Sequence, residues 1–221
     1  DSNGRIGGTA TQLGSTNHSV IATNSGGSAS AEIQIIVVDE APSLWYAALG
    51  NSALTISKGI AIQPLVATSS QGPVITCNSQ PQLPPGLELA TNCNIEGTAT
   101  VLHNQSNFLI TGSNSGGISQ YNLTLTIIDQ PLSNILYGVG NYTFAKQVDA
   151  VDIEPSYDGG VALVWEIQPQ LPTGISFDQS SGAITGTALD IHPTTTYTIF
   201  ANNTGGTGIA SLTLTFVDIT P

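Results

Sequence analysis

The chain has 221 residues, of which only 8% are charged, and 15 acidic side chains against three Lys plus Arg give a formal net charge of −12. This balance excludes a nucleic-acid-binding role, because phosphate contacts need clustered Lys and Arg. It also disfavours docking to an anionic membrane surface, and no apolar run approaches the roughly 20 residues that a membrane helix needs.

Taken in chain order, the segments between frequent Pro and Gly residues alternate apolar and polar side chains, which predicts an all-β fold. One sequence, Asn-x-Gly-Gly, begins at Asn24, Asn114 and Asn203, at intervals of 90 and 89 residues. A module of about 89 residues is therefore repeated. Residues 1–42 match only the second half of a module, whereas 43–130 and 131–221 each hold a complete one.

The incomplete module, residues 1–42, is predicted to form two strands around the turn that begins at Asn24. Its apolar residues recur mostly at period two and should share one face. The face consists of Ile6, Val20, Ile33, Ile35 and Val37. Half a module cannot close a sandwich, so the segment belongs to a longer array, is a proteolytic fragment, or is completed by strand addition from another copy.

Both complete modules end in the same predicted hairpin. Its last strand places apolar residues at period two, at Leu123, Leu125 and Ile127 and at Leu212, Leu214 and Phe216. Earlier in each module, Pro81–Leu89 and Pro169–Phe177 contain the prolines and glycines that turn the chain between short strands.

These motifs carry a family resemblance. The order Leu171-Pro-Thr-Gly-Ile175, Gly182-Ala-Ile-Thr-Gly-Thr187, Tyr197 to Gly206 and a closing Val-Asp resembles the immunoglobulin, cadherin-like tandem repeats of secreted and cell-surface proteins. Repeat 43–130 departs from this pattern, since Asn92-Cys-Asn94 replaces the Thr-Gly turn. The resemblance implies seven-stranded immunoglobulin-like (cadherin-like) β-sandwich repeats, and it implies little about a site.

Cys77 and Cys93 flank the Leu-Pro-Pro-Gly segment of repeat 43–130. A disulfide between them would close a loop of about 16 residues and stabilise by roughly 3 kcal/mol. It would also place the chain outside a reducing cytosol. The alternative is two buried thiols; metal binding is disfavoured because no His or third Cys lies at ligand spacing.

Five Asn-x-Ser/Thr sequons make N-glycosylation a candidate modification, at Asn17, Asn104, Asn122, Asn141 and Asn202. Asn17, Asn122 and Asn202 alternate with core positions and should face solvent.

Each module closes with an aspartate, at Asp39, Asp129 and Asp218, followed within three residues by Pro. Two interpretations remain: a bound Ca²⁺ at the module joints, or a structural Asp that caps the strand end and linker. The absence of an Asp-x-Asp-x-Asp cluster favours the structural one.

Catalysis is not expected. His18, His103 and His192 occupy different settings, and none recurs with a nucleophile or paired carboxylate. Trp45, Tyr46 and Tyr137 are candidates for a sugar-stacking platform, with core packing as the alternative.

We therefore expect a structural, non-catalytic repeat unit of an extracellular filament, appendage or surface stalk. Its partners would be other copies of itself, joined head to tail through the apolar face of residues 1–42, or upstream sequence covering that face. The competing hypothesis is a cell-surface adhesin module that binds a glycan or protein ligand.

Overall fold

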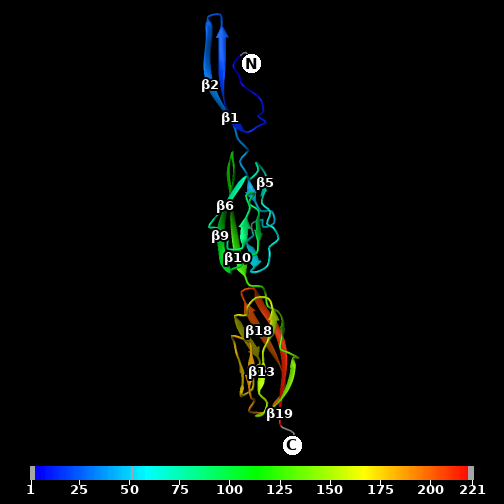
Figure 1. Ribbon diagram of the computed structural model, residues 1–221. Coiled ribbons are helices and arrows are strands. Elements are labelled where there is room, and N and C mark those ends of the chain that lie inside the picture. Colours follow the sequence, from blue (N-terminus) through cyan, green and yellow to red (C-terminus); the bar gives the residue numbers. More distant parts are fainter. Residues whose placement is uncertain (1–2, 51, 219–221) are drawn as a thin grey trace. The chain divides into compact units, whose positions relative to one another are not determined.

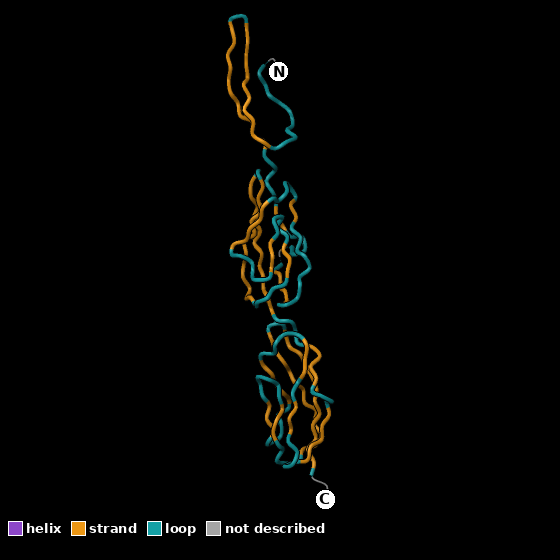
Figure 2. Tube along the Cα trace, viewed as in Figure 1, coloured by secondary structure: helices purple, strands orange, loops and turns teal. Residues whose placement is uncertain are grey.

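The computed structural model describes residues 3–50 and 52–218 (Figure 1). Every regular element in this part is a strand, which confirms the all-β prediction (Figure 2). The described residues contain no helix long and apolar enough to cross a membrane.

The first element is an antiparallel hairpin of β1 (Gly14–Asn24) and β2 (Gly27–Val37), drawn in blue in Figure 1. Its register runs without interruption from Gly14 opposite Val37 to Asn24 opposite Gly27. The Asn24 side chain closes the turn, because its Oδ1 accepts a hydrogen bond from the Gly26 amide at 2.8 Å. The predicted turn chemistry is thus observed.

The described residues of the first sandwich form eight strands. They are β3 (Leu44–Trp45), β4 (Leu54–Ser57), β5 (Thr68–Ser69), β6 (Thr76–Gln80), β7 (Leu87–Leu89), β8 (Ile95–Gly97), β9 (His103–Asn114) and β10 (Gly117–Ile128). One sheet has the order β4-β10-β9-β6, and the short pairs β3-β5 and β7-β8 form the remainder.

The second sandwich repeats this plan. Its strands are β11 (Ser133–Leu136), β12 (Asn141–Ala145), β13 (Val151–Ile153), β14 (Ser156–Asp158), β15 (Val164–Gln168), β16 (Ile175–Phe177), β17 (Ile184–Gly186), β18 (His192–Asn203) and β19 (Gly206–Val217). The large sheet has the order β12-β19-β18-β15, and β13-β17-β16 and β11-β14 form the other sheets.

The described residues of the second sandwich form nine strands, two more than the seven that the family resemblance implies, because two strands are interrupted. The first interruption lies between β11 and β12. Here the chain turns, and the Gly140 amide donates a hydrogen bond to the Tyr137 carbonyl at 2.9 Å. The second interruption lies at Pro155, between β13 and β14. Proline has no amide hydrogen and so cannot donate a hydrogen bond to a neighbouring strand. After its break the first strand changes partner, from β14 to β19.

The core of each sandwich follows the predicted alternation. All six apolar positions predicted on the last strands, β10 and β19, are buried. In the second sandwich they pack with Trp165, Tyr197 and Ile199 into one hydrophobic cluster. Alternate burial along the long strands therefore comes from the period-two pattern.

Candidate functional site

The β1–β2 hairpin has the register of the closing hairpins but lacks their sheet neighbours. Asn203 lies opposite Gly206 as Asn24 lies opposite Gly27. In the second sandwich, β12 pairs parallel with β19 and β15 pairs antiparallel with β18. Within the described residues, β1 and β2 form a two-stranded sheet by themselves. Both outer edges of the hairpin are therefore unpaired.

The repeat alignment shows which parts of these edges have neighbours elsewhere. Strand β12 pairs with Thr213–Val217, which correspond to Gln34–Val38. Strand β15 pairs with Thr198–Asn202, which correspond to Ser19–Thr23. The β6–β9 pairing covers Leu109–Ser113 and gives the same positions on β1. Two strands of defined register would thus pair with both edges of the hairpin.

The predicted apolar face of the hairpin is poorly covered. Val20 and Ile35 are each 37% exposed and Ile6 is 62% exposed, while Ile33 and Val37 are half-buried. The positions that correspond to the four strand residues in the first sandwich are almost completely buried, namely Ile110, Leu123, Leu125 and Ile127. The difference marks the surface that the rest of a module covers in the complete copies.

Sequence reasoning missed two exposed apolar residues on the opposite face. Ile21 is 65% exposed and Ile36 is 62% exposed. The position of Ile36 is threonine in both complete modules, at Thr126 and Thr215. A comparison of outward-facing positions across the repeats would have singled it out.

The Asn-x-Gly-Gly turns hold the segment that leads into each complete module. The Asp129 amide donates to Thr204 Oγ1 at 2.7 Å, and the Thr204 hydroxyl donates to Asp129 Oδ2 at 3.1 Å. The Asn203 amide group donates to the Gln130 carbonyl at 2.8 Å. We call this set of contacts the Asp latch. Its second copy joins Asp39 to Ser115, at 2.9 and 2.7 Å, and Asn114 to the Glu40 carbonyl at 2.7 Å.

Two of the closing aspartates also bind a lysine. Lys58 Nζ lies 3.1 Å from Asp129 Oδ1, and Lys146 Nζ lies 3.0 Å from Asp218 Oδ1. The lysines occupy corresponding positions, since the Lys58 amide donates to the Ile128 carbonyl and the Lys146 amide to the Val217 carbonyl. Their equal placement in the two modules was the sequence signal for these pairs. Among the described residues, Asp39 has no such lysine.

The aspartates lie at strand ends with these protein partners. No group of three or more His, Cys, Asp or Glu side chains that could hold a metal ion occurs in the described part of the chain.

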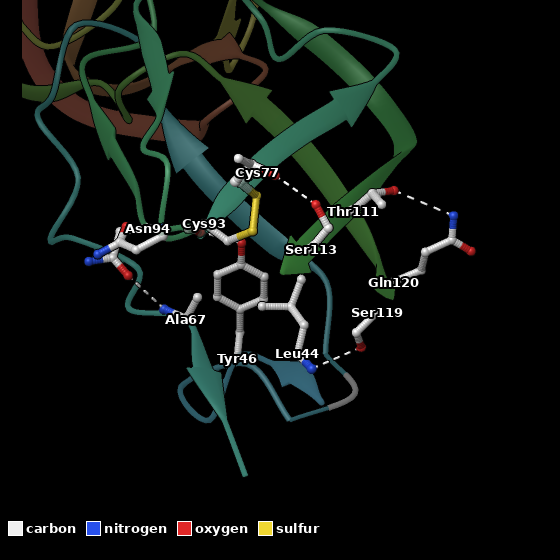
Figure 3. Close-up of a disulfide and its surroundings, with 12 residues drawn as sticks. Leu44, Tyr46, Ala67, Cys77, Cys93, Asn94, Thr111, Ser113, Ser119 and Gln120 are labelled. Carbon is white, nitrogen blue, oxygen red and sulfur yellow. Dashed lines mark hydrogen bonds between the residues drawn. A yellow bond between two sulfur atoms is a disulfide. The ribbon is translucent and has the colours of Figure 1, made fainter. Parts of the chain in front are cut away.

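The disulfide joins Cys77 on β6 to Cys93, with a Cα–Cα distance of 5.3 Å and a sequence separation of 16 residues. Tyr46 lies against it, and the Tyr46 hydroxyl donates to the Cys93 carbonyl at 2.6 Å (Figure 3). In the second sandwich the corresponding Tyr137 hydroxyl donates to the Gly182 carbonyl at 2.7 Å. Burial raises the pKa of both phenols well above the ordinary value. Both hydroxyls therefore remain donors at any physiological pH.

A tryptophan and a glycine replace the disulfide in the second sandwich. Trp165 corresponds to Cys77 and Gly182 to Cys93, and Gly182 and Cys93 both have left-handed backbone, with φ of 77° and 68°. A Cβ atom on Gly182 would lie 2.6 Å from the Trp165 ring. The Cys77–Cys93 disulfide of the first core is thus replaced in the second core by the packing of the Trp165 ring on Gly182.

The structure places four sequon asparagines in exposed positions, Asn17, Asn104, Asn122 and Asn141. Asn202 is half-buried, and its Oδ1 accepts a hydrogen bond from the Thr207 hydroxyl at 2.5 Å. The third residue of that sequon, Thr204, is the hydroxyl of the Asp latch. Use of Asn202 for glycosylation stays a prediction, as it does for the other four.

The three candidate aromatics do not come together as a platform. Tyr46 and Tyr137 are buried in the two cores, whereas Trp45 is 48% exposed. Trp45 ends β3 and Tyr46 comes directly after it, and their exposures differ as expected for side chains that alternate along an extended chain. The histidines are dispersed too: His18 lies on β1 with Thr16 Oγ1 at 2.8 Å, and His103 and His192 begin β9 and β18.

A family model described as Putative Ig domain matches residues 42–128 and again residues 134–217. The chain belongs to this family. It contains two tandem immunoglobulin-like β-sandwich domains, and such modules are typical of extracellular or surface proteins and generally non-catalytic. A search of curated protein sequences finds no match.

Solved structures with similar chains include Sidekick-1 immunoglobulin domains 1–5 and two titin fragments. The Sidekick-1 chain is 13% identical, with 96% of this chain and 47% of that chain covered and a TM-score of 0.41. Titin domains Z1Z2 in complex with telethonin are 15% identical, with 83% and 100% covered and a TM-score of 0.44. The titin I67–I69 variant is 11% identical, with 92% and 75% covered and a TM-score of 0.47. The chain spans about half of the Sidekick-1 chain.

Proposed function

We propose that the protein is a structural, non-catalytic repeat unit of an extracellular filament, appendage or surface stalk. The observation that carries this proposal is the β1–β2 hairpin, which keeps the register of a closing hairpin while, among the described residues, neither of its edges pairs with another strand. Strands from another copy, or from sequence upstream, complete it. Tandem immunoglobulin-like modules with a disulfide are typical of such an extracellular setting.

The completing strand on the β2 edge has a defined chemistry. It runs parallel to Gln34–Val38, as β12 runs along Thr213–Val217. In the two complete modules the corresponding strand is followed by a lysine that reaches the closing aspartate, as Lys58 reaches Asp129 and Lys146 reaches Asp218. The apolar side chains of the completing strand would lie beside those of β2 on the same face, as Phe144 lies beside Phe216 with ring centroids 5.9 Å apart.

Electron microscopy of the purified protein tests this proposal. The expected result is filaments, or elongated particles longer than one 221-residue chain. Monodisperse monomers in which the hairpin is ordered and solvent-facing would contradict assembly as the function.

A second candidate function is adhesion, and the exposed Trp45 favours it. Trp45 is 48% exposed, and an indole face can stack on a sugar ring. A glycan-array measurement should then show binding that Trp45→Ala abolishes. An exposed aliphatic residue, Leu136, occupies the corresponding position of the second module, so Leu136→Ala is the matched control.

A further inference from the structure

The Asn24–Gly27 turn and the closing residue Asp218 each carry one half of the Asp latch. At Asp129 the joint is complete, because Oδ1 binds Lys58 and Oδ2 accepts from Thr204, and the side chain is only 4% exposed. At Asp218, Oδ1 binds Lys146 while the side chain is 64% exposed. Within the described residues Asp218 has no Asn-x-Gly-Gly turn against it. Its Oδ2 is the atom that holds the turn hydroxyl in Asp129.

The complementary half lies in the turn Asn24-Ser25-Gly26-Gly27. The Asn24 Oδ1 accepts from the Gly26 amide at 2.8 Å, and the same 2.8 Å contact occurs at Asn114 and Asn203. The Asn24 turn therefore has the same side-chain hydrogen bond as the two turns that hold an aspartate. Among residues 3–50 and 52–218, the Ser25 hydroxyl and the Asn24 amide nitrogen have no partner. Asn24 is exposed, whereas Asn114 and Asn203 are half-buried under the segments they hold.

Gly26 gives an independent indication that the turn has an occupant. Its φ lies outside the left-handed range, and a Cβ there would meet only the side chain of its own Asn24, at 3.2 Å. Within the hairpin a methyl group would thus press on one side-chain oxygen, but it would meet no backbone atom. At Gly116 and Gly205 a Cβ would collide with the carbonyl oxygens of Asp39 and Asp129. Glycine at position 26 keeps clear the space that an incoming aspartate carbonyl fills in both other copies.

We propose that the Asn24–Gly27 turn of one copy binds the Asp218 end of a second copy. The Asp218 amide donates to Ser25 Oγ, the Ser25 hydroxyl donates to Asp218 Oδ2, and the Asp218 carbonyl lies over Gly26. This inference rests on the proposed structural function and names its contact. The contact joins unlike surfaces, so it is head to tail and repeats along an open chain of copies.

The latch alone is weak between separate chains. A few neutral or singly charged hydrogen bonds support a dissociation constant on the order of millimolar. Sedimentation velocity over a concentration series up to that range is therefore the first measurement. The wild-type chain is expected to form a concentration-dependent series of oligomers.

Three variants test the contact. Ser25→Ala removes the hydroxyl, Gly26→Ala places a methyl group against the incoming carbonyl, and Asp218→Ala removes the carboxylate. Each should weaken association by about tenfold or more. Ser30→Ala, on an exposed position of β2, is the control and should associate like the wild type.

Mixing the variants tests the direction of assembly. A Gly26→Ala copy retains its Asp218 end, and an Asp218→Ala copy retains its turn. Their equimolar mixture should form dimers but no longer species, because only one productive contact remains. Longer oligomers in this mixture would overturn a head-to-tail latch.

Other outcomes separate this inference from the proposed function. If microscopy shows that all three variants still form filaments, the latch contact is contradicted. The proposed structural function would not be affected by that result. A wild-type chain that stays monomeric at millimolar concentration would also overturn it, and would assign the turn to a segment of the same polypeptide.

Discussion

Asp129 and Thr204 exchange two hydrogen bonds: the Asp129 amide donates to Thr204 Oγ1 at 2.7 Å, and the Thr204 hydroxyl donates to the Asp129 carboxylate at 3.1 Å. A residue at the end of one strand is thus fixed by a turn 75 residues later. The same exchange between Asp39 and Ser115 shows that it belongs to the repeat.

Replacing Thr204 with valine should destabilise the second domain by about 2 kcal/mol, because the Asp129 amide and the Oδ2 atom of its buried carboxylate both lose their hydrogen-bond partner, while Oδ1 keeps Lys58. Thr204→Ser should cost much less, since Ser115 makes the same two hydrogen bonds to Asp39 in the first domain. Denaturant unfolding measures both. Thr185→Val, at an exposed position of β17, is the control. Equal effects of Thr204→Val and Thr185→Val would contradict a role for the latch in stability.

The two lysine pairs should differ in strength. Lys58→Ala leaves the buried Asp129, 4% exposed, without a cation, whereas Lys146→Ala affects Asp218, which is 64% exposed. We expect a loss of about 2 kcal/mol for Lys58→Ala and less than about 0.5 kcal/mol for Lys146→Ala, because water screens the exposed pair. The free energies of unfolding of the two variants, measured side by side, check this order. The reverse order would show that burial of Asp129 does not govern its pairing.

Reduction of the disulfide should lower the stability of the first domain alone. Closing a loop of about 16 residues is worth roughly 3 kcal/mol in the chain-entropy model. Calorimetry with and without reductant should show one unfolding transition shifting to lower temperature. The transition of the second domain, which has Trp165 and Gly182 at these positions, is an internal control. Two unshifted transitions would contradict a stabilising disulfide.

Tyr197 and Tyr137 should respond oppositely to loss of the hydroxyl group. Among the described residues, the buried Tyr197 hydroxyl has no hydrogen-bond partner, and Phe108 occupies the corresponding position of the first domain. Tyr197→Phe should therefore leave the domain unchanged or stabilise it by up to about 1 kcal/mol. Tyr137→Phe should cost about 1 to 2 kcal/mol, because it leaves the buried Gly182 carbonyl without its donor. Chemical denaturation compares the two; a clear loss for Tyr197→Phe would mean that its hydroxyl is satisfied.

Local patterns were enough to predict the strands, the turns and the buried faces. The alternation at Leu212, Leu214 and Phe216 predicts which residues of β19 are buried, because side-chain direction in a strand has period two. The Asn-x-Gly-Gly sequences likewise predict hairpin turns from residue chemistry alone.

The contacts between distant segments could not be predicted in this way. The Asn-x-Gly-Gly motif was interpreted as turn chemistry, but its Ser or Thr also binds an aspartate 75 or 76 residues away. Only the folded sheet brings these residues together. The lysine pairs were missed for the same reason, although Lys58 and Lys146 occupy equivalent positions in the two modules.

Hydrogen exchange on the assembled protein tests the central claim most directly, namely that other strands complete the β1–β2 hairpin. The backbone amides of Ser19–Thr23 and Gln34–Val38 should exchange as slowly as those of Thr198–Asn202 and Thr213–Val217, their paired counterparts in the second domain. In dilute, dissociated chains the same hairpin amides should exchange faster. Rapid exchange of the amides on both hairpin edges in the assembled protein would contradict the claim, because it would show that these edges remain unpaired after assembly.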